Sequence, residues 1–262
     1  MTDKQTATMV ISMDRWVGKV AIVTGASAGI GAAIADQLVE NGLIFSQAVG
    51  LARRPELIQE HAKTLNNKKG KLYAIKRDLR KEEDIQGAFK WVEDNLGPVH
   101  ILINNAGTGT GGGLTNTSTE DWRKVFDLNV LGLCIATREA ISSMKKHKID
   151  DGHIIHIYSA AGHRVFSPQF NVYPASKFAV TALTETLRQE LNSLGTKIRV
   201  TSISPGLVAT ELTTLGTKLP SDVREEFHKR PILKAADIAD GVVYVLSTPG
   251  HVQVHELTIR PF

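Results

Sequence analysis

The sequence predicts an α/β fold, a single domain in which helices cover both faces of a seven-stranded parallel sheet. The chain has 262 residues and 42% hydrophobic content, which is enough for one sizeable core and short for two domains. Short β-branched segments alternate with helical patterns, an order typical of parallel sheets with crossover helices. The first strand runs directly into a glycine-rich turn and a helix, as in doubly wound sheets. We expect this domain to cover residues 18–262, and residues 1–17 to form a flexible extension.

The first strand and helix predict an anion site. Residues 20–24 are apolar and β-branched, as in a buried parallel strand, and Ile34, Leu38 and Val39 follow at helical spacing. Between them lies a Gly-x-x-x-Gly-x-Gly turn, whose backbone N–H groups and helix N-terminus would bind the pyrophosphate of a dinucleotide. The turn residues expected to contact this cofactor are Gly25, Ser27, Gly29, Ile30 and Gly31. The alternative is a glycine-rich turn without a ligand.

The end of the second strand bears on the choice of cofactor. This strand is predicted to end at residues 49–52, and Arg53 and Arg54 follow at once. In a Rossmann-like fold this position meets the adenosine ribose, where an acid would bind a 2′-hydroxyl and an arginine a 2′-phosphate. Because no acid stands there, the sequence favours NADP(H) over NAD(H). The alternative is a pair of solvated arginines before a helix that begins at Pro55.

The rest of the chain continues the alternation of strands and helices. Further strands are expected at residues 72–76, 100–104, 153–158, 198–203 and 256–259. Asp78, at the carboxyl end of one strand, would bind an adenine amino group or cap the next helix. A long helix after Ser118 is expected to carry these residues inward: Trp122, Val125, Phe126, Asn129, Val130, Leu133 and Ile135. Residues 107–112 spell Gly-x-Gly-x-x-Gly, but no helix begins at Gly112, so we interpret them as a mobile loop beside the active site.

A tyrosine and a lysine four residues apart predict an acid–base pair. On a helix, Tyr173 and Lys177 lie one turn apart on the same face, which brings the ammonium near the phenol oxygen. A neighbouring cation favours the phenolate of a group whose usual pKa is about 10, and the protonated phenol serves as a general acid in the reverse direction. The alternative is a solvated helix face. Ser159 ends a predicted strand at the edge where open α/β sheets bind ligands.

Taken together, these motifs resemble the short-chain dehydrogenase/reductase family over residues 18–260. The matching segments are residues 24–31, Asn104-Asn105-Ala106-Gly107, Asn129, Ser159, Tyr173-x-x-x-Lys177 and Pro205-Gly206. The resemblance implies a catalytic tetrad of Asn129, Ser159, Tyr173 and Lys177. In it Tyr173 is the acid/base and Ser159 polarises the substrate oxygen, while Lys177 holds the nicotinamide ribose and Asn129 supports a water in a proton relay. It also implies cofactor contacts by Asp78, Leu79, Asn105, Ala106, Gly107, Tyr173, Lys177, Pro205, Gly206, Val208 and Thr210.

Further segments resemble one subgroup of that family, the insect NADP-dependent farnesol dehydrogenases and vertebrate dehydrogenase/reductase family member eleven. They are residues 13–16, 151–155, 162–164 and 246–249. This resemblance implies an NADP(H)-dependent enzyme that interconverts an alcohol and its carbonyl. It also implies that the helices carrying Asn129 and Tyr173 pair into a homodimer or homotetramer. One departure is an apparent insertion within residues 43–48, beside the second strand.

An apolar segment after Gly206 indicates the substrate class. We expect residues 207–232 to form a lid of short helical pieces, with apolar side chains at Leu207, Val208, Leu212, Leu215, Leu219 and Phe227. Phe166 and Phe170 precede Tyr173 on the opposite side, and no basic cluster faces them. An apolar alcohol or carbonyl of isoprenoid or steroid type is therefore expected. The resemblance to the subgroup implies farnesol or a ketosteroid as the specific compound. The alternatives are a lid packed onto its own core above a polar pocket, a broad-specificity reductase of small xenobiotic carbonyls, and a non-catalytic NADP-binding protein.

The composition argues against several other classes of protein. Lysine and arginine number 31 against 27 acids, and the basic clusters at residues 68–71 and 145–148 have no interleaved aromatic residues, so no nucleic-acid partner is expected. No apolar run reaches the roughly 18 residues of a membrane span. The single cysteine, Cys134, lies among apolar residues, as in the core of a protein from a reducing compartment. Residues 1–12 lack a secretory signal pattern. We expect a cytoplasmic location and no metal site.

Overall fold

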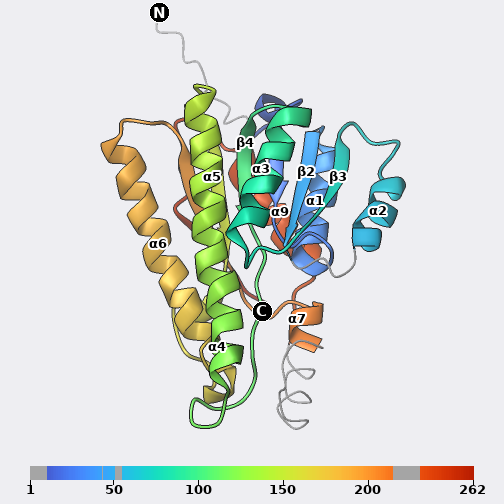
Figure 1. Ribbon diagram of the computed structural model, residues 1–262. Helices are drawn as coiled ribbons and strands as arrows, with labels where there is room; N and C mark the ends of the chain where they lie inside the picture. The colour runs from blue at the N-terminus through green and yellow to red at the C-terminus, as the bar shows by residue number, and fades with distance from the viewer. Residues whose placement is uncertain (1–10, 43, 51–54, 215–230) are drawn as a thin grey trace, which may run out of the picture.

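The computed structural model describes residues 11–42, 44–50, 55–214 and 231–262, whose strands form one parallel sheet (Figure 1). The order across the sheet is β3-β2-β1-β4-β5-β6-β7. The strands are β1 (Val20–Val23), β2 (Ile44–Gly50), β3 (Lys71–Arg77), β4 (Val99–Asn104), β5 (His153–Ile157), β6 (Arg199–Pro205) and β7 (Glu256–Ile259). The strand order reverses at β1 and β4, which is the switch point where open α/β sheets bind their ligands.

Helices cover both faces of this sheet, which confirms the predicted Rossmann-like α/β fold (Figure 1). Val23 and Ile103 lie in a buried cluster with residues of α1 and α9, whereas Ile22 and Leu102 lie in a second cluster with residues of α3 and α5. Adjacent strand residues therefore face opposite cores. The helices are α1 (Gly29–Glu40), α2 (Pro55–Thr64), α3 (Glu82–Leu96), α4 (Thr119–Phe126), α5 (Leu133–Lys146), α6 (Tyr173–Ser193), α7 (Glu211–Thr214) and α9 (Ala235–Ser247). No helix in the described ranges is both long and apolar enough to cross a membrane.

The segment before β1 is packed onto the domain. Trp16 is 1% exposed, and its indole Nε1 donates a hydrogen bond to the carbonyl of Leu246 in α9 at 2.8 Å. Met13 is buried in the same cluster. The expectation of a flexible extension over residues 1–17 is therefore wrong for residues 13–17, because an indole with a partnered N–H is a strong anchor. Residues 1–10 lie outside the described ranges.

The long helix predicted after Ser118 is interrupted by a π-helix, η2 (Asp127–Gly132). Its start agrees with the sequence, since the Ser118 hydroxyl accepts the N–H of Asp121 at 3.1 Å as an N-cap. A π-helix bonds residue i to i+5, which shifts the phase of all following side chains. Leu128, within the π-helix, is 2% exposed, whereas Phe126, the last residue of α4, is 38% exposed, so the prediction that Phe126 faces inward is wrong. Asn129 is buried, as predicted.

The second strand takes up most of the apparent insertion. β2 pairs with β3 from Ile44 to Gly50, so five of the residues from 43 to 48 lie in regular strand structure. The strand ends at Gly50, close to the predicted end. Arg53 and Arg54 lie outside the described residues.

Part of the predicted lid belongs to the body of the domain. Val208 is 3% exposed and lies in the cluster that contains α1 and α9. The neighbouring backbone is tied to the chain before α9, because Ala209 N donates to Leu233 O at 2.8 Å and Leu233 N donates to Leu207 O at 2.9 Å. For Val208, packing onto the core is therefore the correct interpretation. Leu215, Leu219 and Phe227 lie outside the described residues.

Candidate active site

The turn between β1 and α1 depends on glycine at three positions. Gly25 and Gly29 have φ angles of +69° and +58°, in the left-handed region that other residues rarely adopt. A Cβ atom on Gly31 would lie 2.4 Å from the carbonyl oxygen of Gly25 and 2.5 Å from Asn105 Nδ2. The turn is therefore closer to its neighbours than any larger residue allows. It stands at the carboxyl end of β1, at the switch point of the sheet.

Thr24 and Asn105 hold this turn against the end of β4. Thr24 Oγ1 accepts hydrogen bonds from the N–H groups of Asn105 and Ala106, each at 3.0 Å. Asn105 Nδ2 donates to the carbonyls of Thr24 at 3.0 Å and Gly25 at 3.1 Å. These bonds engage the Asn105 side chain within the protein, so this residue shapes the turn. Thr24 was not among the residues predicted to contact the cofactor, although a hydroxyl between the strand and its first glycine was a visible signal.

The N-terminal end of α1 fits an anionic group. The N-cap residue is Ala28, which has no side chain to accept a hydrogen bond from the first turn of the helix. The N–H groups and the positive end of the helix dipole therefore favour a phosphate. Thr210 borders the turn, since a Cβ atom on Gly29 would lie 3.1 Å from Thr210 Cγ2. The arrangement fits the pyrophosphate of a dinucleotide.

Asp78, just after β3, does not cap α3. Its carboxylate accepts hydrogen bonds from the backbone N–H of Arg80 at 3.0 Å and from Arg80 Nη2 at 2.6 Å. The hydrogen bond to the Arg80 guanidinium is the main cause that holds the pKa of Asp78 below its usual value. The N-cap of α3 is Lys81, so the capping interpretation is wrong and an adenine contact stays a prediction. Leu79 is buried, and its carbonyl packs against Gly132 of η2.

Asn129 lies in the π-helix and links two parts of the site. Its Oδ1 accepts the N–H of Thr108 at 2.8 Å, and its Nδ2 donates to Thr108 O at 2.9 Å and to Ser176 Oγ at 3.0 Å. Ser176 Oγ in turn donates to the carbonyl of Tyr173 at 2.7 Å. Asn129 thus joins the glycine loop after β4 to the first turn of α6, and both N–H donors of its amide are engaged. Ser176 was not among the predicted site residues, because its role depends on this contact between distant segments.

Ser159 follows β5 and begins the short helix η3 (Ala160–Gly162), where its hydroxyl accepts the N–H of Ala161 at 3.1 Å. Gly162 presses this helix onto α6, since a Cβ atom there would lie 3.0 Å from the carbonyl of Lys177. Thr181 Oγ1 also donates to the carbonyls of Gly162 and Lys177, each at 3.1 Å. These contacts fix Ser159 relative to the helix that carries the tyrosine and the lysine.

Burial, opposed by a hydrogen bond to Ser159, raises the pKa of the Tyr173 phenol above its usual value. We expected Lys177 to favour the phenolate, but in the structure desolvation is the dominant influence. The phenol is therefore protonated at neutral pH. Lys177 is 5% exposed, and its Nζ lies 5.6 Å from the centre of the Tyr173 ring. Burial lowers the pKa of this lysine to about 8.

The structure brings the four members of the expected tetrad together. Tyr173 bonds Ser159, and Lys177 lies over the Tyr173 ring. Gly107 lies next to both Asn129 and Lys177, because a Cβ atom on it would lie 3.5 Å from Asn129 Oδ1 and 3.6 Å from Lys177 Nζ. A phenol, a hydroxyl and an ammonium at one site can donate hydrogen bonds to a substrate oxygen and move a proton.

Pro205 and Gly206 lie at the end of β6, against the last strand of the sheet. Gly206 N donates to the carbonyl of Ile259 in β7 at 2.7 Å, and a Cβ atom on Gly206 would lie 3.0 Å from Pro261 Cδ. The chain therefore turns here in close contact with the last strand. Thr210 follows next to Gly29, so the segment after β6 reaches the glycine turn.

A polar row that the sequence analysis did not predict lies behind the site. Asn104 Nδ2 donates to Thr137 Oγ1 at 2.9 Å, and His156 Nδ1 lies 2.8 Å from Thr184 Oγ1 in α6. Burial, together with the charge of Lys177, lowers the pKa of His156 to about 4, so this imidazole is neutral. It is a buried hydrogen-bonding group of the core.

The chain resembles curated proteins over nearly its full length. It is 51% identical over 252 residues to a farnesol dehydrogenase from Aedes aegypti, covering 95% of this chain and 98% of that protein. It is 46% identical over 253 residues to dehydrogenase/reductase SDR family member 11 from Bos taurus, covering 95% and 98%.

Solved structures share the fold. An alcohol dehydrogenase from the archaeon Thermococcus sibiricus, complexed with 5-hydroxy-NADP, matches with a TM-score of 0.79 and 28% identity over 93% of this chain and 96% of that one. The closed form of a serine dehydrogenase complexed with NADP+ matches with a TM-score of 0.81 and 32% identity over 92% and 94%. Residues 19–218 match the short chain dehydrogenase family. With this match, the close relatives and the shared fold, the chain belongs to the short-chain dehydrogenase/reductase family and is an oxidoreductase.

Proposed function

We propose that this enzyme uses NADP(H) to interconvert an apolar alcohol, of isoprenoid or ketosteroid type, and its carbonyl. The observation that carries the proposal is the convergence of Ser159, Tyr173 and Lys177 beside the glycine turn at the switch point of the sheet. A dinucleotide whose pyrophosphate lies at the start of α1 would extend along the carboxyl ends of β1 and β4 toward this cluster.

The residues divide the chemistry between them. A nicotinamide bound there would supply the hydride in reduction and accept it in oxidation. In reduction, Tyr173 Oη donates its proton to the carbonyl oxygen, for which the raised pKa of the phenol provides the protonated form. Ser159 Oγ donates a hydrogen bond to the same oxygen as negative charge develops there. Lys177 Nζ would hold the nicotinamide ribose, and Asn129 would support a water in the relay that restores the proton.

Three considerations support NADP(H) and an apolar substrate. Arg53 and Arg54 follow β2, where an arginine suits a 2′-phosphate. The two structural neighbours above are complexes with 5-hydroxy-NADP and NADP+, and one close relative is a farnesol dehydrogenase. Val165 and Phe166, between Ser159 and Tyr173, are exposed apolar residues, although the Arg164 guanidinium lies 4.3 Å above the Phe166 ring. That cation is the observation that favours the second candidate, a broad-specificity carbonyl reductase that accepts polar substrates.

The acid–base assignment is tested by Tyr173→Phe. Because this change removes only the phenol oxygen, the NADPH affinity should change far less than kcat, which should fall by more than about a hundredfold. NADPH fluorescence titration measures the first quantity, and nicotinamide absorbance with farnesal, ketosteroids and quinones measures the second. A variant that retained a tenth of wild-type kcat would contradict the assignment.

The substrate class is tested with a homologous series of primary aldehydes. In an apolar pocket, each added methylene should raise kcat/KM by about threefold to fourfold over several carbons, since each buried CH₂ contributes about 0.8 kcal/mol. Comparison of NADPH with NADH in the same assay tests the cofactor. A flat series with normal turnover would leave the carbonyl reductase as the better candidate.

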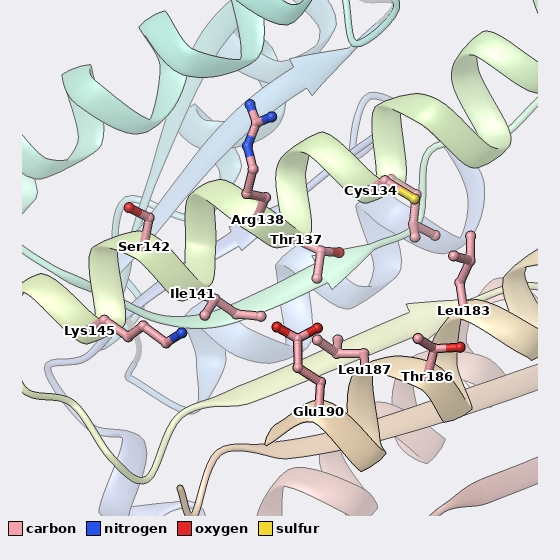
Figure 2. Close-up of a pocket in the computed structure, with 11 residues that line it drawn as sticks. Cys134, Thr137, Arg138, Ile141, Ser142, Lys145, Leu183, Thr186, Leu187 and Glu190 are labelled. Atoms are coloured by element: carbon pink, nitrogen blue, oxygen red, sulfur yellow. The ribbon is translucent and has the colours of Figure 1, made fainter. Parts of the chain in front are cut away.

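We also propose a homodimer or homotetramer that pairs through α5 and α6. A groove of about 400 Å³ runs between these helices, and its apolar wall includes Leu133, Ile141, Leu183 and Leu187 (Figure 2). None of the four tetrad residues lines this groove. Phe126, Leu131 and Phe178, on the same helical layer, are also exposed. An apolar face of this kind is typical of a subunit interface.

A further inference from the structure

Asn171 has a backbone conformation that asparagine rarely adopts. Its φ and ψ angles are 52° and −125°, and it ends the short helix η4 (Pro168–Phe170). Among the described residues, only Lys148 is another non-glycine residue with positive φ. A conformation of this kind persists only where the surrounding contacts impose it, and it concentrates at functional sites.

The contacts that impose it come from the Asn171 side chain. Its Oδ1 accepts a hydrogen bond from the indole Nε1 of Trp122 at 3.1 Å. Its Nδ2 donates to Thr117 Oγ1 at 2.5 Å and more weakly to the carbonyl of Gly113 at 3.4 Å. Thr117 Oγ1 itself donates to Gly113 O at 2.9 Å. One amide thus ties together α4, the turn before α4 and the end of the glycine loop after β4.

The position of Asn171 connects these contacts to the reaction. It lies two residues before Tyr173, the first residue of α6. At the other end of the glycine loop, Asn129 bonds both backbone groups of Thr108 and, through Ser176, the start of α6. The loop over residues 107–113 is therefore held to the tyrosine segment at both ends, each time by an asparagine amide. Asn129 belongs to the expected tetrad, whereas Asn171 was not singled out by any motif.

We propose that Asn171 is a positioning residue for the oxidoreductase reaction, whose amide holds the start of α6 so that the Tyr173 phenol points at the substrate oxygen. It touches neither substrate nor cofactor and acts through Tyr173. The inference rests on the proposed function, because it concerns the placement of the proposed proton donor. It predicts that loss of the amide slows the chemical step without weakening cofactor binding.

The decisive variant is Asn171→Gly. Glycine adopts positive φ without strain, so this change removes the amide contacts while the backbone keeps its path. With NADPH and an active carbonyl substrate, kcat should fall by about tenfold or more, while the dissociation constant of NADPH stays within about twofold. A deuterium isotope effect from NADPH labelled at the transferred position should increase, because hydride and proton transfer become slower than product release.

Two further variants separate positioning from general stability. Lys148→Gly relieves the other positive φ, in the turn after α5, and should leave kcat unchanged. Trp122→Phe removes the indole N–H donor together with the fused pyrrole ring, and it should lower kcat in the same direction. The double variant with Asn171→Gly should be no slower than Asn171→Gly alone, because the hydrogen bond between Trp122 and Asn171 is already absent there. Trp122→Phe alone carries the test where Asn171→Gly does not fold.

The outcomes are distinct. Wild-type kcat in Asn171→Gly would overturn the inference and leave the proposed function intact. A parallel loss of kcat, NADPH affinity and melting temperature would show a general structural role and also overturn it. If the wild-type protein turns over none of the carbonyl panel with NADPH, the proposed function falls and the inference falls with it.

Discussion

At the scale of single residues, burial of Lys177 lowers the stability of the fold while it places an ammonium group in the site. Burial of an ammonium is unfavourable, and it lowers the pKa of Lys177 from 10.5 to about 8. Below pH 8 Lys177 is protonated in both the folded and the unfolded chain, so the full unfavourable free energy of burying its charge is present. As the pH rises from 8 to 10.5, the unfolded chain binds more protons than the folded one, and this contribution to stability improves.

Lys177→Met should therefore stabilise the fold at pH 7, by on the order of 3 kcal/mol, while it abolishes turnover. This gain in stability should shrink as the pH rises from 8 to 10.5, because wild-type Lys177 is then neutral in the folded chain and no charge is buried. Urea unfolding at several pH values measures this. The control is Lys146→Met, whose exposed ammonium pairs with Glu93 at 2.9 Å, and which should change stability by less than about 1 kcal/mol. A destabilised Lys177→Met variant would contradict the argument.

At the scale of elements, the π-helix η2 determines how close α5 lies to the loop after β3. A Cβ atom on Gly132 would lie 2.5 Å from the carbonyl oxygen of Leu79 and 3.2 Å from that of Asp127. Both neighbours are backbone atoms, which cannot rotate aside. The same close approach lies next to Asn129, so a shift of η2 would reach the site.

Gly132→Ala should destabilise the protein by roughly 1–3 kcal/mol, as in other overpacked cores, and should also lower kcat. Gly87→Ala is the matched comparison, because Gly87 lies within α3 and a Cβ there meets only Arg77 side-chain atoms at 3.6 Å or more. Alanine is the better helix former, so this variant should gain about 0.5–1 kcal/mol. Thermal unfolding compares the two variants, and equal changes in stability would contradict the explanation.

The elements also show what a sequence can and cannot specify. The glycine turn after β1, the Ser118 N-cap and the Tyr173 helix were predictable, because each depends on residues within one or two turns of chain. The π-helix was not, since Phe126 and Leu128 fit a regular helix equally well until the packing of Leu79 against Gly132 is known. The bonds of Asn129 and Asn171 likewise join segments that are distant in sequence. Binding of a 2′-phosphate by Arg53 and Arg54 remains a prediction.

At the scale of the whole molecule, the proposed assembly has a direct test. Light scattering at micromolar concentration should give the mass of a dimer or tetramer. Leu183→Glu with Leu187→Glu places charges in the α5–α6 groove and should yield monomers, because both side chains line it. The control is Tyr244→Glu, an exposed residue of α9 on the other face of the sheet, which should leave the mass unchanged. A monomeric wild-type protein would contradict the proposal.

The bond between Trp16 and Leu246 has a consequence for synthesis on the ribosome. These residues are separated by 230 positions, so Leu246, which anchors Trp16, is synthesised near the end of translation. At 5–20 residues per second, the apolar face of α1 waits roughly 10–50 s for α9 to emerge. During that interval the nascent chain presents Ile34 and Leu38 without their native partners in α9. The growing polypeptide is therefore a natural client for chaperones that bind apolar segments at the exit tunnel.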